Sequence, residues 1–184
     1  TNTNLVCLEL KSGDQRWKTD HRIELRQAVV KRTSGAWATP TLTSHGGMVY
    51  VADFRKLSAF SVADGKRLWE TPSAGGFNTP PDVFIINNQL WRGTSPSRRS
   101  ADFREGLNTK TGKVETTIAI DKAWEYPTLA HPRCYRAKAT SRFIFTNVSG
   151  IECIDLQAGE ASLNHWVRGT CQYGIMPCNG LLYV

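Results

Sequence analysis

The fold is decided by one stretch of the chain, LSAFSVADGKRLWETP, which spans residues 57–72. Apolar and small residues lead into Asp64-Gly65, and Trp69 follows four residues after the glycine. Asp-Gly between two such segments is typical of a tight β-hairpin turn, because glycine adopts the positive φ that these turns need. The stretch therefore predicts a strand, a turn and a second strand, with a tryptophan at a set distance beyond the turn.

The same pattern occurs four times along the chain and aligns without a gap. The copies are CLELKSGDQRW, AFSVADGKRLW, GLNTKTGKVET and CIDLQAGEASL, at residues 7–17, 59–69, 106–116 and 153–163. Their turn glycines follow one another at intervals of about 47 to 52 residues. A period of this length is typical of solenoids, propellers or arrays of small units.

Two columns of the alignment predict how the repeated units pack. Six residues before each turn glycine the residue is small: Cys7, Ala59, Gly106 and Cys153. Four residues after the glycine the column reads Trp17, Trp69, Thr116 and Leu163. We expect the ring of one sheet to fill the space left by the small side chain of another. Radial four-stranded sheets with one such signature each form a β-propeller, so we predict an all-β fold with about four antiparallel four-stranded blades' worth of sequence.

A third column is polar and short. It lies four residues before each turn glycine and reads Glu9, Ser61, Asn108 and Asp155. Short polar side chains at this place accept hydrogen bonds from backbone amides of the turn that follows. We therefore expect these oxygens to hold the turns in shape.

These columns resemble the tryptophan-docking signature of the PQQ-like, or quinoprotein-type, propeller repeats, which reads Ala, any residue, Asp or Asn, two residues, Thr, Gly, three residues and Trp. Residues 59–69 match its Ala, Gly and Trp, whereas residues 106–116 supply the Asn, Thr and Gly but end on Thr116. The resemblance covers essentially the whole chain and implies a propeller. It leaves the function open, because dehydrogenases, assembly lipoproteins and other envelope proteins share this scaffold.

The repeat predicts the division of the chain into blades. We expect an outer half-blade at 1–20, full blades at 36–75, 76–123 and 127–170, and an inner half-blade at 171–184. The chain would then be a partial ring from a larger bacterial propeller protein. Its two half-blades complement each other, so we predict closure either within one chain or between two copies paired head to tail, and the smaller wedge angle of larger rings favours the homodimer.

Composition and cysteine usage narrow the possible partners and cofactors. The net charge of +7 is scattered among loops, which is typical of a solvated surface and does not favour nucleic acid, and no membrane span is expected. Cys7 and Cys153 occupy the small-residue column, where packing accounts for them. A disulfide among Cys134, Cys171 and Cys178 is left open, and the sequence shows no metal-binding motif.

Catalysis is not expected from this part of the chain. Quinone-dependent dehydrogenases that the sequence resembles hold PQQ with a vicinal disulfide, a calcium ion and a catalytic aspartate, but no Cys-Cys pair occurs here. The carboxylates lie in what look like ordinary turn or strand contexts, at Asp53, Asp82, Asp102, Asp121 and Asp155. We therefore expect no catalytic residue, no metal and no cofactor.

Two stretches are dense in His, Arg, Tyr and Cys: AHPRCYR at 130–136 and HWVRGTCQYG at 165–174. Both are expected where innermost strands begin, beside the propeller axis. The candidate binding residues at this channel mouth are His131, Arg133, Tyr135, Arg168, Cys171 and Tyr173. In the alternative interpretation, the arginines tie blade carbonyls together and the tyrosines pack between sheets.

Two functions from different classes follow. The first is a non-catalytic PQQ-like propeller module of a periplasmic or other cell-envelope protein, which acts as a scaffold for a protein, peptide or glycan. The second is part of a quinoprotein-type oxidoreductase whose PQQ and calcium residues lie outside this segment. The sequence favours the first.

Overall fold

A computed structural model describes residues 2–24, 40–53, 55–73, 81–93, 103–119, 135–146, 150–164, 166–170 and 173–184. These residues form strands and turns and contain no helix. The strands are β1 (Asn2–Thr3), β2 (Val6–Leu8), β3 (Gln15–Lys18), β4 (Ile23–Glu24), β5 (Thr41–His45), β6 (Met48–Ala52), β7 (Lys56–Ser61), β8 (Arg67–Pro72), β9 (Val83–Ile86), β10 (Gln89–Arg92), β11 (Glu105–Asn108), β12 (Val114–Thr117), β13 (Lys138–Ala139), β14 (Phe143–Phe145), β15 (Cys153–Asp155), β16 (Glu160–Ser162), β17 (Met176–Cys178) and β18 (Leu181–Tyr183).

The strands form successive antiparallel sheets that follow the order of the sequence. Three sheets have four strands each, in the orders β5-β6-β7-β8, β9-β10-β11-β12 and β13-β14-β15-β16. The pairs β2-β3, β17-β18 and β1-β4 form two-stranded sheets. This arrangement confirms the predicted all-β propeller with four-stranded blades.

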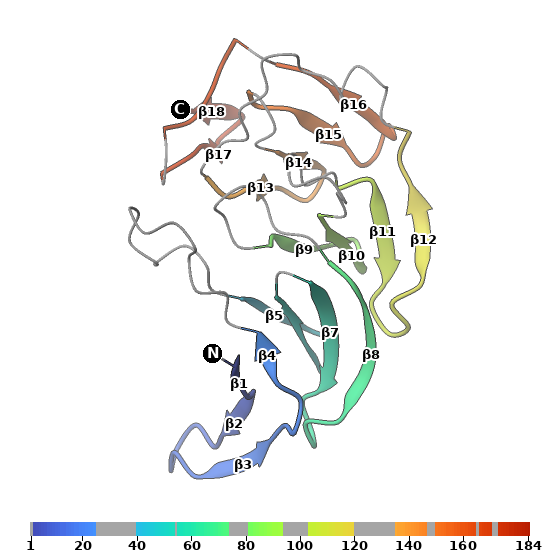
Figure 1. Cartoon of the computed structure of the whole chain (residues 1–184). Coiled ribbons are helices and arrows are strands. Elements are labelled where there is room, and N and C mark those ends of the chain that lie inside the picture. Colours follow the sequence, from blue (N-terminus) through green and yellow to red (C-terminus); the bar gives the residue numbers. More distant parts are fainter. Residues whose placement is uncertain are drawn as a thin grey trace.

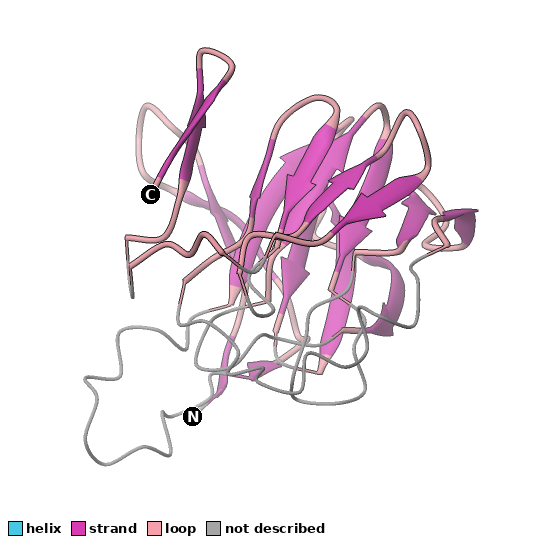
Figure 2. Ribbon diagram, turned by 90° about the horizontal axis from the view of Figure 1, so that it is seen from above, coloured by secondary structure: helices cyan, strands magenta, loops and turns pink. Residues whose placement is uncertain are grey.

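The sheets fan out along an arc (Figure 1). Strands β5, β9 and β13 lie on its concave side and β8, β12 and β16 on its convex side, so the first strand of each blade is the innermost. A view turned by 90° shows strands of neighbouring sheets standing side by side (Figure 2). The hairpins β2-β3 and β17-β18 lie at opposite ends of the arc and in separate sheets, so this structure does not show closure of the ring within one chain.

The hairpin turn between the third and fourth strands of each blade is built by local hydrogen bonds. In the turn from β7 to β8, Gly65 has a φ of 73° and its N–H donates to the carbonyl of Ser61 at 2.9 Å. The Ser61 hydroxyl accepts from Ala63 N–H at 3.2 Å. Asn108 and Asp155 accept turn amides in the same way, which confirms the expected role of the polar column in these copies.

A β-bulge sets which residue stands opposite the small column. Ala59 pairs with Trp69 while Phe60 pairs with Arg67, so β8 carries one extra residue. The same register shift occurs between β2 and β3 and between β11 and β12. In the fourth copy the pairing is regular and Cys153 pairs with Ser162. The ungapped alignment that placed Leu163 in the tryptophan column was therefore wrong, because this hairpin lacks the bulge.

Each column tryptophan lies on the turn glycine of the next blade. A Cβ added at Gly112 would lie 2.7 Å from Cε3 of Trp69, and the Trp69 indole N–H donates to the carbonyl of Thr109 at 3.0 Å. Trp17 repeats this contact on Gly65, with its N–H on the Val62 carbonyl at 2.8 Å. The ring thus fills the space over the turn glycine of the neighbour. The expectation that it fills the small-residue column was wrong, because that residue pairs with the tryptophan of its own hairpin.

Apolar cores fill the interfaces between neighbouring blades. Tyr50, Leu57 and Leu107 belong to the core between the first two full sheets, where they are fully buried. The next interface is built by residues that include Trp91, Phe103 and Ile154. Burial of such side chains is worth about 1.5 to 3 kcal/mol each. The chain therefore has one core for each blade interface.

The docked Trp69 gives a direct test of blade cohesion. Replacing it with alanine removes the ring from Gly112 and the hydrogen bond to Thr109, and we expect the free energy of unfolding to fall by about 3 kcal/mol. Trp166 is the control because its side chain is 97% exposed, so Trp166→Ala should change stability by less than about 0.5 kcal/mol. Denaturant titrations of both variants measure the difference, and equal losses would contradict the docking geometry.

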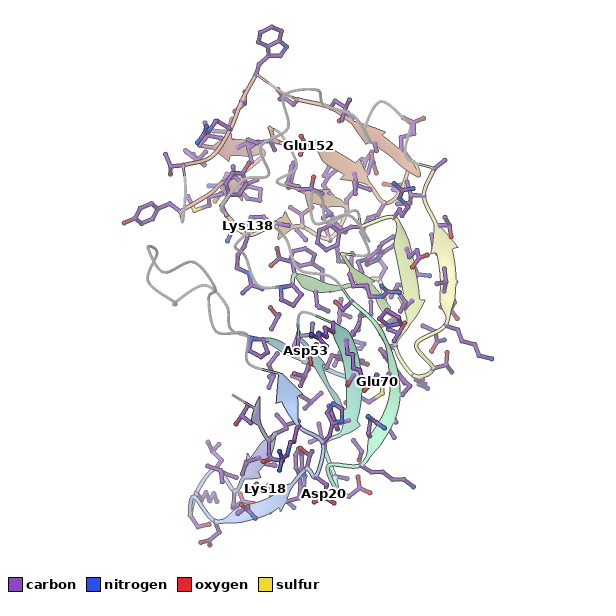
Figure 3. All side chains as sticks on the ribbon, viewed as in Figure 1. Lys18, Asp20, Asp53, Glu70, Lys138 and Glu152 are labelled. Atoms are coloured by element: carbon purple, nitrogen blue, oxygen red, sulfur yellow. The ribbon has the colours of Figure 1, made fainter. Side chains whose placement is uncertain are left out.

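A polar cluster joins the N-terminal segment to the β5-β8 sheet. The Nδ1 atom of His21 lies 3.0 Å from Nη1 of Arg67, which also donates to Glu70 at 2.9 Å, and the His21 ring packs against Phe60. Glu70 lies on β8 (Figure 3) and also pairs with Lys56 at 2.8 Å. Burial, and next the charge of Arg67, lower the pKa of His21, and this outweighs the opposite effect of Glu70.

The lowered pKa of His21 predicts a loss of stability in mild acid. The unfolded chain binds a proton at this residue near pH 6.5, whereas the folded chain resists it, so the neutral ring stabilises the fold fully above about pH 6.5. We expect the free energy of unfolding to fall as the pH drops below that value, and His21→Gln to make this fall smaller. Denaturant titrations measure this pH dependence at several pH values, all of them high enough that Glu70 stays ionised. An identical pH dependence for both proteins would contradict the prediction.

Candidate functional site

Three polar residues occupy the same place in three consecutive blades. In each blade a hairpin turn joins the first strand to the second, and the last residue before this turn is His45, Ile86 or Thr140. Four residues before these positions the chain carries Thr41, Asp82 and Arg136, respectively. These positions lie where the innermost strands β5, β9 and β13 begin. We call Thr41, Asp82 and Arg136 the axial cluster, because innermost strands line the axis of a propeller.

One arginine joins the cluster across three blades. Nε of Arg136 donates to Oδ1 of Asp82 at 2.6 Å, and Nη2 donates to the hydroxyl of Thr41 at 2.7 Å. The other carboxylate oxygen of Asp82 accepts Ala137 N–H at 2.8 Å, and the Thr41 hydroxyl donates to the carbonyl of Pro81 at 2.5 Å. The inner ends of neighbouring blades are therefore held by charge-assisted hydrogen bonds.

Burial divides the cluster into a hidden anion and an accessible cation. Asp82 is 5% exposed, whereas the side chain of Arg136 is 42% exposed. Burial raises the pKa of Asp82 above its ordinary value, against the opposing effects of the Arg136 charge and the Ala137 N–H. Lys138 adds a second positive charge nearby on β13 (Figure 3). The cluster thus presents cationic donors around one buried carboxylate.

The axial cluster has donor capacity left for a ligand. A guanidinium carries five N–H donors, and the bonds from Arg136 to described residues leave from Nε and Nη2. The Nη1 donors of this half-exposed side chain can bind a carbonyl or carboxylate of another molecule.

The structure places the residues that the sequence predicted for the channel mouth in different environments. Tyr135 is 1% exposed and donates its hydroxyl to the Gly150 carbonyl at 2.7 Å, so it packs between sheets as the alternative interpretation held. Arg168 is exposed and Tyr173 is 86% exposed, both in the segment before β17. His131, Arg133 and Cys171 lie outside the described residues. The predicted set is therefore not seen together as one site.

Sequence reasoning missed the axial cluster. It treated Asp82 as a residue in an ordinary turn or strand context, which was wrong because the carboxylate is buried and bonded to Arg136 from the next blade. A weak signal was present, since Pro40-Thr41 and Pro81-Asp82 both place a polar residue after proline at the start of an inner strand. Aligning the inner strands as well as the tryptophan hairpins would have found it.

Two other buried carboxylates stabilise the turn between the second and third strands of their blades. Asp53 accepts the amides of Arg55 and Lys56 at 2.8 and 2.7 Å, between β6 and β7. Glu152 accepts Gly150 N–H at 2.8 Å and the hydroxyl of Thr146 at 3.1 Å, between β14 and β15. These bonds shape the turns that lead into the third strands.

The described residues do not fit the PQQ and calcium site that the resemblance to quinone-dependent dehydrogenases implied. The chain has no adjacent cysteine pair, and within the described ranges no three His, Cys, Asp or Glu side chains are grouped to hold a metal. Cys178 is an exposed free thiol, and Cys7 and Cys153 are also free. Of the disulfide pairings that the sequence left open, only Cys134 with Cys171 stays open, and both lie outside the described residues.

The class of the protein follows from these features. Four-stranded sheets in sequence order, joined by indoles on the glycines of the next blade, define a β-propeller of PQQ-like repeats. The chain belongs to the family described as outer membrane protein assembly factor BamB, whose family pattern matches residues 1–114. In the part of the chain that the structure describes, no helix is long and apolar enough to cross a membrane.

One solved structure agrees with this fold, and a second resembles the chain more weakly. The chain is similar to BamB from Moraxella catarrhalis with 14% sequence identity and a TM-score of 0.54, over 88% of this chain and 47% of that one. It therefore spans about half the length of that protein. The computationally designed Ika4 protein matches with 10% identity and a TM-score of 0.48, over 79% of this chain and 89% of that one. No protein with a curated description matches the sequence significantly.

The axial cluster gives a second stability test. Asp82→Ala leaves Arg136 without its partner and Ala137 N–H without an acceptor, so we expect a loss of about 3 kcal/mol in the free energy of unfolding. The pair Arg142–Asp155 is the control, because the side chain of Arg142 is 50% exposed, and Arg142→Ala should cost less than about 1 kcal/mol. Urea titrations compare the two variants. A smaller loss for Asp82→Ala than for Arg142→Ala would show that the cluster does not tie the blades.

Proposed function

We propose that this chain is a non-catalytic β-propeller module of a cell-envelope protein, located in the periplasm or at the outer membrane, and that it acts as a scaffold for a protein partner. The observation that carries the proposal is the match of residues 1–114 to the BamB family, which is described as an assembly factor. The propeller fold is compatible with it, because a rigid scaffold positions the loops that carry binding residues.

Three exposed side chains support a protein partner over a peptide or glycan. Trp166 and Tyr173 are 97% and 86% exposed, and Arg168 lies between them in sequence. Tryptophan, tyrosine and arginine are the residues that most often dominate the binding energy of protein interfaces. The same segment leads into β17, which lies near the C-terminal end of the arc (Figure 1).

Site-specific crosslinking in cells tests the proposal. A photoreactive amino acid is placed at position 173 of the full-length protein, and at position 68 as the control, because Leu68 is also exposed but lies on the outer strand β8. We expect a discrete envelope-protein adduct from position 173 and none of that size from position 68. The absence of an adduct from 173, or the same adducts from both positions, would contradict the proposal.

Calorimetry separates the scaffold role from the quinoprotein alternative. The scaffold needs no cofactor, so titration of PQQ with calcium into the 184-residue chain should give no saturable heat. Saturable binding at micromolar concentration would favour the oxidoreductase. Head-to-tail pairing of two copies stays a prediction of the sequence, and light scattering on the purified chain measures it.

A further inference from the structure

The two docked tryptophans define what we call an indole seat. It consists of a turn glycine at positive φ and the backbone carbonyl three residues before it. Gly65 and the Val62 carbonyl form the seat for Trp17, and Gly112 and the Thr109 carbonyl form the seat for Trp69. The glycine lets the ring lie on the backbone, and the carbonyl accepts the indole N–H.

The next turn in the chain has the same backbone but no ring on it. Gly159 has a φ of 71°, close to the 73° and 69° of Gly65 and Gly112, and its N–H donates to Asp155 at 2.9 Å as in those turns. No described atom lies within 4 Å of a Cβ added at Gly159, whereas an indole lies within 3 Å of the same point at the two filled seats. No described residue therefore fills the seat formed by Gly159 and the Leu156 carbonyl, which we call the open seat.

The reason is the residue that replaces tryptophan in the preceding blade. Thr116 pairs with Gly106 as Trp69 pairs with Ala59, but its hydroxyl accepts a hydrogen bond from Nε2 of Gln89 at 2.8 Å within its own sheet. The side chain of threonine is too short to cross to the next turn. The described residues of the blade that should supply the ring thus supply none.

The interface behind the open seat has unmet hydrogen-bonding capacity. At the preceding interface, the Thr109 carbonyl accepts both Trp69 and the hydroxyl of Tyr50, the latter at 3.2 Å. No hydrogen bond from a described residue reaches the corresponding Leu156 carbonyl. Trp91, which takes the place of Tyr50, is 2% exposed and its buried indole nitrogen has no acceptor in the described structure.

The open seat is continuous with an established apolar interface. Leu156 packs against the cluster that holds Ile118 and Ile154, so a ring over Gly159 would extend that core toward the surface. Val114 lies on β12, the strand that also carries Thr116, and it is 48% exposed. The occupant that fits is an indole, because the two matching seats in the same chain hold one.

We propose that the seat at Gly159 binds a tryptophan side chain carried on an extended segment of a partner protein. The inference rests on the proposed scaffold role, and it names the group by which a partner is recognised. The partner's indole N–H donates to the Leu156 carbonyl, and its ring covers Gly159. The partner's ring thereby takes the place that a ring from the fourth strand of the preceding blade takes at the filled seats.

Peptide titration followed by NMR tests the seat directly. The probe is the peptide KRLWETP, which copies residues 66–72 and carries the chain's own docking tryptophan. The matched control peptide has alanine in place of that tryptophan. Both are added to the isotope-labelled 184-residue chain, and the amide signals of Gly159 and Leu156 are compared with those of Gly65 and Gly112, whose seats are filled.

We expect saturable shifts at Gly159 and Leu156 with the tryptophan peptide, and none at Gly65 or Gly112. The alanine peptide should lose these shifts. Thr116→Trp fills the seat from within and should abolish them, whereas Thr117→Trp, at the exposed neighbouring position, should leave them unchanged. If Thr116→Trp does not fold, the comparison of the two peptides still decides the outcome.

Three results would overturn the inference: no saturable shift at Gly159, equal shifts with both peptides, or unchanged binding to folded Thr116→Trp. These results are separate from the crosslinking at position 173. A failed titration with a discrete crosslink would remove the seat and keep the scaffold role, whereas a positive titration without a crosslink would keep the seat and remove the proposed partner surface.

Discussion

The structure depends first on a tryptophan ring that lies on the turn glycine of the next blade, a contact that is made at two of the described blade interfaces. This contact joins units that are otherwise local hairpins, because each four-stranded sheet pairs its strands only with its own neighbours in sequence. The indole has two requirements of the neighbour, a glycine without a Cβ and a carbonyl at hydrogen-bonding distance. Both are supplied by one turn, so the spacing from glycine to tryptophan also sets the spacing between blades.

Contacts at two distances from the propeller axis hold the blades together. Tryptophan docking works at the outer hairpins, while Arg136 joins Asp82 and Thr41 where the inner strands begin. The outer contact is mainly apolar, and the inner contact depends on a buried carboxylate whose pKa is raised by burial. The two contacts respond to different conditions, because acid protonates the carboxylate of the inner contact and leaves the docked rings unchanged. An interlocked arc of this kind is a suitable support for binding residues on its surface.

The sequence predicted the hairpins because their determinants are local. Asp64-Gly65 and the polar residue four positions before the glycine specify the turn by themselves. The sequence predicted the wrong contact for the tryptophan ring. The bulge pairs Trp69 with Ala59 of its own hairpin, so the ring meets the turn glycine of the next blade instead of that blade's small residue. A register shift of one residue leaves little trace in an alignment of periodic columns.

The candidate site was harder to predict because its members are far apart in the chain. Arg136 bonds to a residue 95 positions away, and neither partner lies in the tryptophan hairpins that carried the alignment. Tyr135, by contrast, was proposed for a ligand site on composition, but its hydroxyl is used by Gly150. Residue type alone does not separate a side chain that closes a core from one that faces a ligand, whereas its position in the strand does.

The docking of tryptophan on glycine is the central claim, and proton NMR measures it directly. An aromatic ring above a glycine shifts the resonances of its α protons upfield, and the shift disappears when the ring is removed. The account predicts α-proton resonances of Gly65 and Gly112 upfield of those of Gly13 and Gly159, over which no ring lies in the described structure. Similar α-proton shifts at all four glycines, or a Gly112 resonance that Trp69→Ala leaves in place, would contradict it.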